Sequence, residues 1–207
     1  MSGGERLFRC EDPAVWRGVY EKYWAVVEAK AAGKRRNSEK LVELEKWYQE
    51  ELPALILART ERSLTHSELV KLMEWKLTRG KFRPRLKQLI SSNSKETVLL
   101  CTKKAFAILP DVQSAIAELS TLKGLGPATA SGNQGHTKVD YIDDYYFSAD
   151  SQHDWTAHKV ELCLWAFSVA SQVQPSLLEA FALSDYTNRE TDKEETMEQP
   201  SKRRKKE

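Results

Sequence analysis

Apolar residues recur at helical spacing through most of the chain. Between Asp12-Pro13, a pair typical of a helix N-terminus, and Gly33, one face carries Trp16, Val19, Tyr20, Tyr23, Val26 and Val27. Similar patterns predict helices over about 38–52, 65–80, 84–90, 95–109, 110–122, 155–173 and 175–183. Strand-like residues are confined to 145–147, too few to build a sheet. The pattern therefore predicts an all-α fold, a helical bundle.

Local signals fix several boundaries of these helices. Thr65 and Glu68 have the spacing of a capping box, Pro53 is expected to break or restart the second helix, and Gly80 is expected to close the third. The stretch from Trp155 is apolar nearly all round, which indicates a central buried helix.

Two segments lack helical periodicity. Residues 132–153 contain glycine, asparagine, several acids and aromatic residues, and we interpret them as a long irregular loop. From residue 184 the chain is polar, which is typical of a disordered tail. We therefore expect one helical domain over 1–183 and a disordered C-terminal tail over 184–207.

The composition is that of an ordinary globular protein. Of the 207 residues, 41% are hydrophobic and 30% charged. We expect no membrane association, because no apolar run reaches the ~18 residues of a spanning helix. We also expect no secretory signal, because the N-terminus M-S-G-G-E-R-L-F-R-C has no apolar h-region. Three cysteines without a C-x-x-C pair argue against a disulfide framework or a zinc site, and we expect Cys101 and Cys163 in the core. The net charge of +2 does not by itself indicate a nucleic-acid partner.

The segment 119–131 reads L-S-T-L-K-G-L-G-P-A-T-A-S. The amphipathic pattern of the preceding helix ends at Leu122, a Gly-x-Gly turn follows, and Pro127 begins a new helix. Both Gly124 and Gly126 allow a positive φ and leave the backbone uncovered by side chains. Leu125 is expected to point back between the helices and fix the turn.

The amides after this turn suit a phosphate oxygen. The N–H groups of Ala128 and Thr129 would belong to a helix N-terminus, where they have no intrahelical partner and lie at the positive end of the helix dipole. Lys123 stands beside the turn and adds a positive charge. Amides of this kind hold a nucleic-acid backbone without reading its sequence.

This segment resembles the helix-hairpin-helix of the DNA glycosylase superfamily, whose hairpin reads L-P-G-[VI]-G-x-[KY]-T-A. The matching residues are Leu122, Gly124, Leu125, Gly126, Thr129 and Ala130. The resemblance implies a helix-hairpin-helix over about 111–131 that grips DNA. The alternative is a tight helix–helix connector with no ligand.

The departures from that family bear on catalysis. The place of the family's lysine nucleophile is occupied by Ala128, and the register of its catalytic aspartate falls on Tyr146. Lyase chemistry through a Schiff base is thus unsupported, and the absence of a four-cysteine cluster excludes the iron–sulfur variant. We lean against an enzyme; the alternative is a monofunctional glycosylase-like protein that uses an acid from residues 140–150.

The chain also resembles a eukaryotic family whose shared phrases cover residues 64–84, 122–131 and 155–165. This second resemblance bears on the fold rather than on the activity. In similar chains the helix after the hairpin continues, whereas here Ser131 is followed by Gly132-Asn133-Gln134-Gly135. We hypothesise a shortened or alternatively spliced form in which DNA binding is impaired.

A basic segment lies between residues 71 and 87. Its seven cations are Lys71, Lys76, Arg79, Lys81, Arg83, Arg85 and Lys87. Glu74 alone opposes them, and Trp75 and Phe82 lie among them. Such a surface can meet phosphates and stack on an unpaired base; the alternative is a solvated helix end with Trp75 in the core. The candidate DNA contacts are Lys76, Arg79, Lys81, Arg83 and Arg85.

Two further groups of residues have the composition of sites. His136, His153 and His158 lie near several acids, but their spacing fits no standard metal set, so we expect no metal and interpret His158 as a helix-surface or packing residue. The tail ends in Lys202, Arg203, Arg204, Lys205 and Lys206. This run is typical of a nuclear import signal or a polyanion contact, and the alternative is a solubilising tail.

The sequence thus favours a noncatalytic nuclear protein that binds the DNA backbone, in a setting such as DNA repair. It would need no cofactor, and its partners would be DNA phosphates and an import receptor. A glycosylase-like base-excision enzyme and a helical protein-interaction scaffold are the alternatives.

Overall fold

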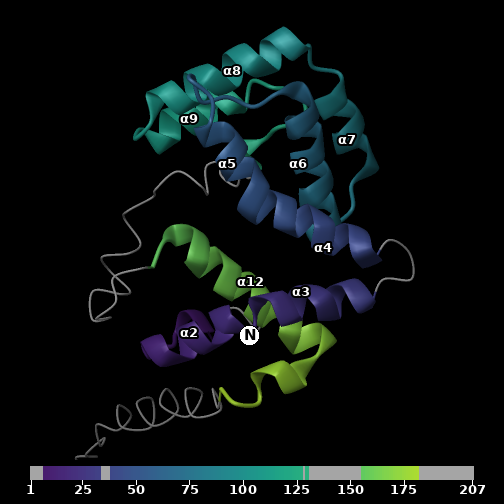
Figure 1. Ribbon diagram of the computed structural model, residues 1–207, viewed down its shortest axis with the longest axis vertical. Coiled ribbons are helices and arrows are strands. Elements are labelled where there is room, and N and C mark those ends of the chain that lie inside the picture. The colour runs from purple at the N-terminus through teal and green to yellow at the C-terminus, as the bar shows by residue number, and fades with distance from the viewer. Residues whose placement is uncertain (1–6, 34–37, 128, 131–154, 182–207) are drawn as a thin grey trace, which may run out of the picture. The chain divides into compact units, whose positions relative to one another are not determined.

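The computed structural model describes residues 7–33, 38–127, 129–130 and 155–181. All regular secondary structure in these ranges is helical, with no strand among them (Figure 1). The all-α prediction is confirmed for this part of the chain. The interpretations of 132–153 as a loop and of 184–207 as a disordered tail fall outside the described residues.

The described helices occur in the following order along the chain. They are α2 (Pro13–Glu21), α3 (Tyr23–Ala32), α4 (Ser38–Lys46), the π-helix η1 (Trp47–Glu51), α5 (Leu52–Leu57), α6 (His66–Arg79), α7 (Pro84–Ser91), α8 (Lys95–Ile108), α9 (Val112–Leu119), α12 (Ala157–Val173) and the 3₁₀ helix η2 (Pro175–Leu178). None of the described helices has the length and apolar character needed to cross a membrane.

The chain divides into two compact units. The first comprises residues 1–26 and 162–207, and the second comprises residues 27–161, so the boundaries fall inside α3 and α12. The candidate DNA contacts in the glycine-containing segment and the basic segment all belong to the second unit.

The first unit packs α2 against the later part of α12. The Trp16 indole donates to the Cys10 carbonyl at 2.8 Å, and the Cys163 thiol lies 3.6 Å from the Trp16 carbonyl. Cys10, Cys101 and Cys163 are all buried thiols, as expected for the last two. The side chain of Asp12 accepts from the Ala14 amide and caps α2, which confirms the predicted start.

The single helix expected between Pro13 and Gly33 is in fact two. Lys22, with φ at −83° and ψ at −3°, forms a turn between α2 and α3. Neither proline nor glycine stands at this break, so the local sequence carries no signal for it. At the other end, the helix expected over 175–183 is a 3₁₀ helix that covers only Pro175–Leu178.

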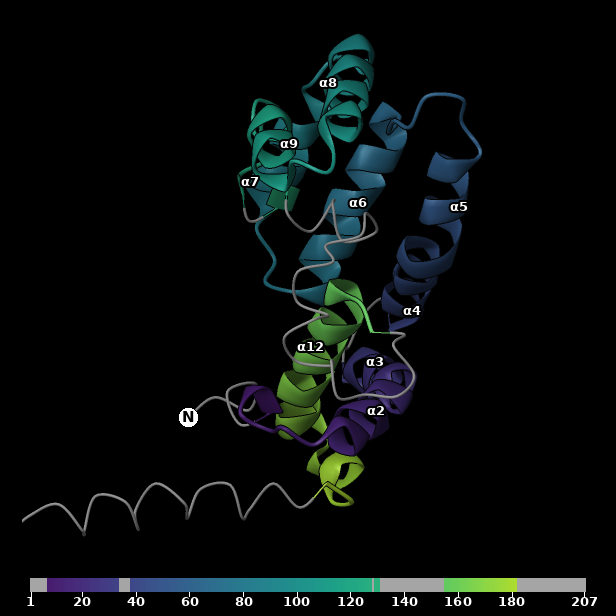
Figure 2. The same ribbon diagram turned by 90° about the vertical axis from the view of Figure 1, so that its left-hand side faces the viewer.

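The second unit is built around one hydrophobic core. Residues from α4 to the segment after α9 contribute to it: Leu44, Trp47, Tyr48, Leu52, Leu69, Leu72, Met73, Trp75, Ile90, Val98, Cys101, Ala115, Leu119, Leu122, Leu125 and Ala130 are among its members. Figures 1 and 2 show that α8 packs beside α9 and that α7 packs beside α6.

Pro53 does not interrupt the helical segment, and the helix α5 begins beside it. It stands in the first turn of α5, and the five residues before α5 form the π-helix η1. Proline has no N–H to give to the carbonyl four residues earlier, so a change of helical winding just before it is expected. The wider turn carries Trp47 and Tyr48, which are both buried.

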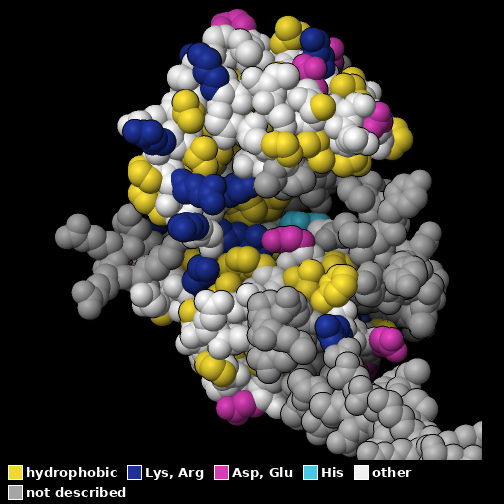
Figure 3. All heavy atoms as spheres, turned by 180° about the vertical axis from the view of Figure 1, so that it is seen from behind, with side chains coloured by type: hydrophobic (Ala, Val, Ile, Leu, Met, Phe, Trp, Pro, Cys, Tyr) yellow, Lys and Arg dark blue, Asp and Glu magenta, His cyan; other side chains and the backbone are white. Residues whose placement is uncertain are grey.

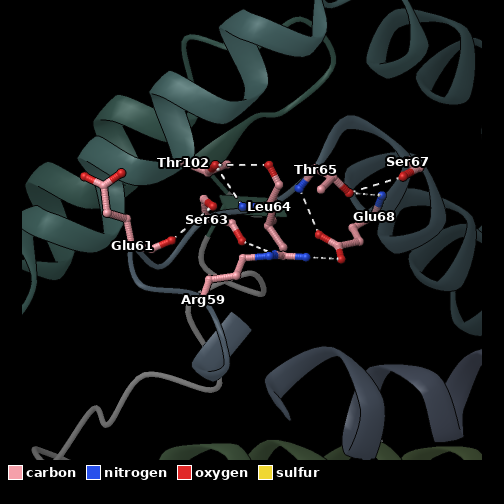
Figure 4. A network of polar contacts seen from close by, with 8 residues as sticks. All are labelled: Arg59, Glu61, Ser63, Leu64, Thr65, Ser67, Glu68 and Thr102. Atoms are coloured by element: carbon pink, nitrogen blue, oxygen red, sulfur yellow. Dashed lines mark hydrogen bonds and ion pairs between the residues drawn. The ribbon is translucent and has the colours of Figure 1, made fainter. Parts of the chain in front are cut away.

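The start of α6 is the best-defined helix end in the unit. Thr65 and Glu68 form the predicted capping box with both bonds present. Arg59 donates to the Ser63 carbonyl and to the Glu68 carboxylate, and Thr102 of α8 accepts from the Leu64 amide at 3.0 Å (Figure 4). These bonds fix α6, which carries much of the basic segment, relative to α8.

Candidate nucleic-acid interface

The chain reverses direction after α9 in a turn that we call the glycine turn, residues 120–126. The helix α9 ends at Leu119, one turn earlier than the pattern suggested. The Leu122 amide then donates to the Leu119 carbonyl at 3.1 Å, and the Leu125 amide to the Leu122 carbonyl at 3.0 Å. The chain becomes helical again at Pro127. Leu125 is buried in the core, as expected of a residue that fixes the turn.

Gly124 has a conformation and a packing environment that demand glycine. Its φ is +81°, in the left-handed region. A Cβ on Gly124 would lie 2.9 Å from the Leu89 Cβ and 3.2 Å from the Ile90 nitrogen. The turn is therefore pressed against the C-terminal end of α7.

Gly126 differs from Gly124. Its φ is not positive, so the freedom that both glycines allow is used at Gly124 alone. A Cβ on Gly126 would meet no atom within 4 Å. This glycine instead leaves the corner of the turn uncovered, and Gly126 and Pro127 are exposed.

Asn93 clamps the turn in place, a contact that the sequence pattern does not predict. Its side-chain oxygen accepts from the Lys123 amide at 2.9 Å, and its side-chain nitrogen lies 3.1 Å from the Lys123 carbonyl. The same nitrogen donates to the Ile90 carbonyl at 2.9 Å. Because Asn93 and Lys123 are 30 residues apart, the sequence shows Asn93 only as a loop residue before α8.

The exposed side of the glycine turn consists of the Lys123 side chain and uncovered backbone at Gly126. The Lys123 side chain is exposed. The Gly126 carbonyl accepts from the Thr129 and Ala130 amides at 2.8 and 3.0 Å, whereas the Gly126 amide has no acceptor among the described residues. Ala128, the other amide proposed as a phosphate contact, lies outside the described residues.

Lys76 joins the glycine turn to the basic segment. Its ammonium donates to the Thr129 hydroxyl at 2.9 Å, which places the residues after the turn beside α6 (Figure 2). Partial burial lowers the pKa of Lys76, and the nearby Arg83 lowers it further. The hydrogen bond between Lys76 and Thr129 therefore links the chain after the glycine turn to α6.

The exposed cations of the basic segment and of the glycine turn include four that lack a carboxylate partner among the described residues. Lys81, Arg83 and Arg85 are exposed, and none of them, nor Lys123, forms an ion pair with a described residue. Figure 3 shows Lys and Arg side chains gathered beside exposed hydrophobic side chains on the side of the second unit where α7 lies.

Other cations of the basic segment have internal partners. The Lys87 ammonium lies 3.2 Å from the Glu74 carboxylate, and that of Lys71 lies 4.7 Å from the centre of the Trp47 ring. These two lysines therefore contribute little to the unpaired positive surface.

Arg79 must be removed from the predicted contacts. Its side chain is only 9% exposed, and its guanidinium lies 2.7 Å from the Glu161 carboxylate and 3.7 Å from that of Glu45. It also lies 5.3 Å from the centre of the Trp75 ring. A guanidinium held by two carboxylates inside the unit is not available to a phosphate.

Arg79 belongs to a buried polar cluster that the sequence does not reveal. The Trp75 indole donates to the Glu45 carboxylate at 2.9 Å, and Gln49 donates to the same carboxylate at 3.0 Å. Gln49 also contacts His158 at 2.6 Å. The only sequence signal is Glu45 itself, a charged residue beside Leu44 on an otherwise apolar face.

The cluster settles the interpretation of two residues. Trp75 stacks on the Tyr48 ring at 3.6 Å between centroids, so the core alternative for Trp75 is the right one. Burial, aided by the Arg79 charge, lowers the pKa of His158 to about 4, and His158 is a packing residue. Burial raises the pKa of Tyr48, and the Glu161 charge adds to that shift.

The residues with a candidate role in catalysis lie mostly outside the described residues. These are Tyr146, the acids of 140–150, His136 and His153, and the same holds for the tail cluster 202–206. Within the described ranges, no three His, Cys, Asp or Glu side chains gather as metal ligands would.

No family model, curated protein or solved structure matches this chain.

Proposed function

We propose that this chain binds the backbone of duplex DNA through the glycine turn and the exposed cations Lys81, Arg83, Arg85 and Lys123. In this proposal α9, the turn and the helical residues from Pro127 form a helix-hairpin-helix. The protein acts as a binding module and not as an enzyme. The observation that carries the proposal is four exposed cations without carboxylate partners among the described residues, one of which, Lys123, belongs to the turn whose Gly126 backbone is uncovered.

The chemistry of this surface suits phosphates better than bases. Lysine and arginine neutralise phosphate charge, and backbone amides add hydrogen bonds that carry no sequence information. The Gly126 corner is clear of side chains, so a phosphate oxygen can approach the backbone closely. The bond between Lys76 and Thr129 keeps the turn and the basic segment together.

The charge count gives an expected salt dependence. If each of the four cations neutralises one phosphate, the slope of log K against log salt is about −3.6. The affinity should then fall roughly 100-fold between 50 and 200 mM salt. A protein that contacts DNA through uncharged groups would show a much smaller slope.

Fluorescence anisotropy or gel shift with a labelled duplex, titrated at several salt concentrations, tests the proposal. The double variant Lys123→Glu with Gly126→Val should weaken binding and lower the salt slope. Lys46→Glu is the matched control, because it makes the same charge change at an exposed position of α4. Failure to bind any duplex at low salt would refute the proposal and favour the protein-interaction scaffold.

The enzymatic alternative has its own readout. Duplexes that carry damaged bases are incubated with the protein and analysed for abasic sites. Abasic products at a lesion would replace the binding-module proposal with a glycosylase-like activity, and their absence on all lesions would favour the binding module.

The proposed place of action is the nucleus. It rests on the five consecutive basic residues 202–206 of the sequence, which we propose as the contact of an import receptor. Replacing all five by alanine in the full chain should abolish nuclear accumulation of a fluorescent fusion. Unchanged accumulation would mean that the run is only a solubilising tail.

A further inference from the structure

Phe82 is an aromatic side chain that does not pack into the hydrophobic core. It is 71% exposed, more than any other large hydrophobic side chain among the described residues. Burying a phenylalanine contributes about 1.5–3 kcal/mol to folding, and this contribution is forgone here. By contrast, Trp75 of the same segment is buried and stacked on Tyr48.

The backbone around Phe82 is short and held at both ends. Gly80 ends α6, with its amide donating to the Lys76 carbonyl at 2.9 Å. Pro84 begins α7, and the Leu86 amide donates to the Arg83 carbonyl at 3.1 Å. The connection between the two helices is therefore only residues 80–83, and Phe82 lies close to both helix ends.

The neighbours of Phe82 identify the chemistry of a partner. Lys81 and Arg83 flank it, both exposed and without an ion pair to any described residue. An aromatic ring between two such cations complements a base between two phosphates. A purely apolar partner would leave both charges without a counterion.

We propose that Phe82 stacks on an unpaired base and that the preferred ligand is DNA with a single-stranded stretch next to a duplex. This inference rests on the proposed function, because the duplex is held by the glycine turn. The turn and the basic segment are linked by the hydrogen bond of 2.9 Å that the Lys76 ammonium donates to the Thr129 hydroxyl.

Anisotropy titrations with a blunt duplex and with the same duplex bearing a 3′ or a 5′ single-stranded extension test this inference. The wild-type chain should bind one of the extended duplexes about tenfold more tightly than the blunt one, the size of effect that one base–aromatic stack gives. Phe82→Ala should remove this difference and leave blunt-duplex binding unchanged, and Phe82→Trp should retain it.

A spectroscopic readout isolates the stacking itself. A 2-aminopurine placed in the extension should be quenched by the wild-type chain and by Phe82→Trp, but not by Phe82→Ala. Leu57→Ala is the control, because Leu57 is 65% exposed on α5 and should change nothing.

The possible failures are distinguishable. Equal affinity of wild type and Phe82→Ala for every extended duplex overturns the stacking inference, while salt-dependent binding of the blunt duplex keeps the proposed function. Absence of binding to all DNAs removes both.

Discussion

Replacing Gly124 by alanine tests whether the glycine turn is held by packing as the structure describes. The substitution adds one methyl group at a position with φ of +81° that faces the end of α7. The matched substitution is Gly126→Ala, two residues away, where the methyl group would enter open space.

The cost at Gly124 has two parts. A left-handed conformation costs a residue with a Cβ about 1–2 kcal/mol. The added Cβ would lie 2.9 Å from the Leu89 Cβ and 3.2 Å from the Ile90 nitrogen, and the backbone atom cannot give way by a rotamer change. Forcing such a shift in a packed region costs about 1–3 kcal/mol. Since alanine also restricts the unfolded chain by about 0.4–1 kcal/mol, the net destabilisation should be about 2–4 kcal/mol.

The expected cost at Gly126 is smaller. Strain and overlap are absent there, and the remaining effect is that alanine is a poorer residue than glycine at the start of a helix, about 1 kcal/mol or less. Urea unfolding followed by tryptophan fluorescence measures both variants against the wild type. Equal destabilisation by the two substitutions would refute this account of the turn.

Three further predictions concern the contacts behind the interface. Asn93→Ala should lower the free energy of unfolding by about 1–3 kcal/mol in the same assay, because it removes the clamp on the Lys123 backbone; an unchanged midpoint would contradict the clamp. Glu45→Ala should cost about 3–5 kcal/mol, since it leaves the buried Arg79 guanidinium without one of its two carboxylates. The pKa of His158 is about 4 in the folded chain, against an ordinary value of 6.5, so the unfolded chain binds more protons between these values. Stability should therefore fall as the pH drops from about 6.5 to about 4, and His158→Gln should flatten that part of the profile; an identical profile for the variant would contradict the assignment.

Helix starts are the most predictable features of this fold. Asp12 and Thr65 each carry a side-chain acceptor at the right spacing, and both cap a helix as expected. These signals work because the interaction is completed within three residues of sequence. The bend of the chain at Gly124 is predictable for the same reason, since a positive φ is a local property.

Features that depend on distant partners are not predictable in this way. The clamp of Asn93 on Lys123 spans 30 residues, and the contact of His158 with Gln49 spans 109. The break at Lys22 also has no local cause in the sequence. For Asn93 and His158 the partner, not the residue type, decides the structure.

Arg79 and Arg83 show that a count of charges along the sequence does not reveal which of them are exposed. Both belong to the basic segment, yet Arg79 is buried against Glu45 and Glu161 while Arg83 is exposed. The helical period distinguishes them: Arg79 lies seven residues after Leu72 and four after Trp75, on the buried face of α6, whereas Arg83 lies beyond the end of that helix. The helical period, applied to the cations as well as to the apolar residues, places Arg79 in the interior. The exposed part of the basic segment is thus defined by where α6 ends: Lys81, Phe82 and Arg83 follow Gly80, at which the helix stops, and all three are exposed.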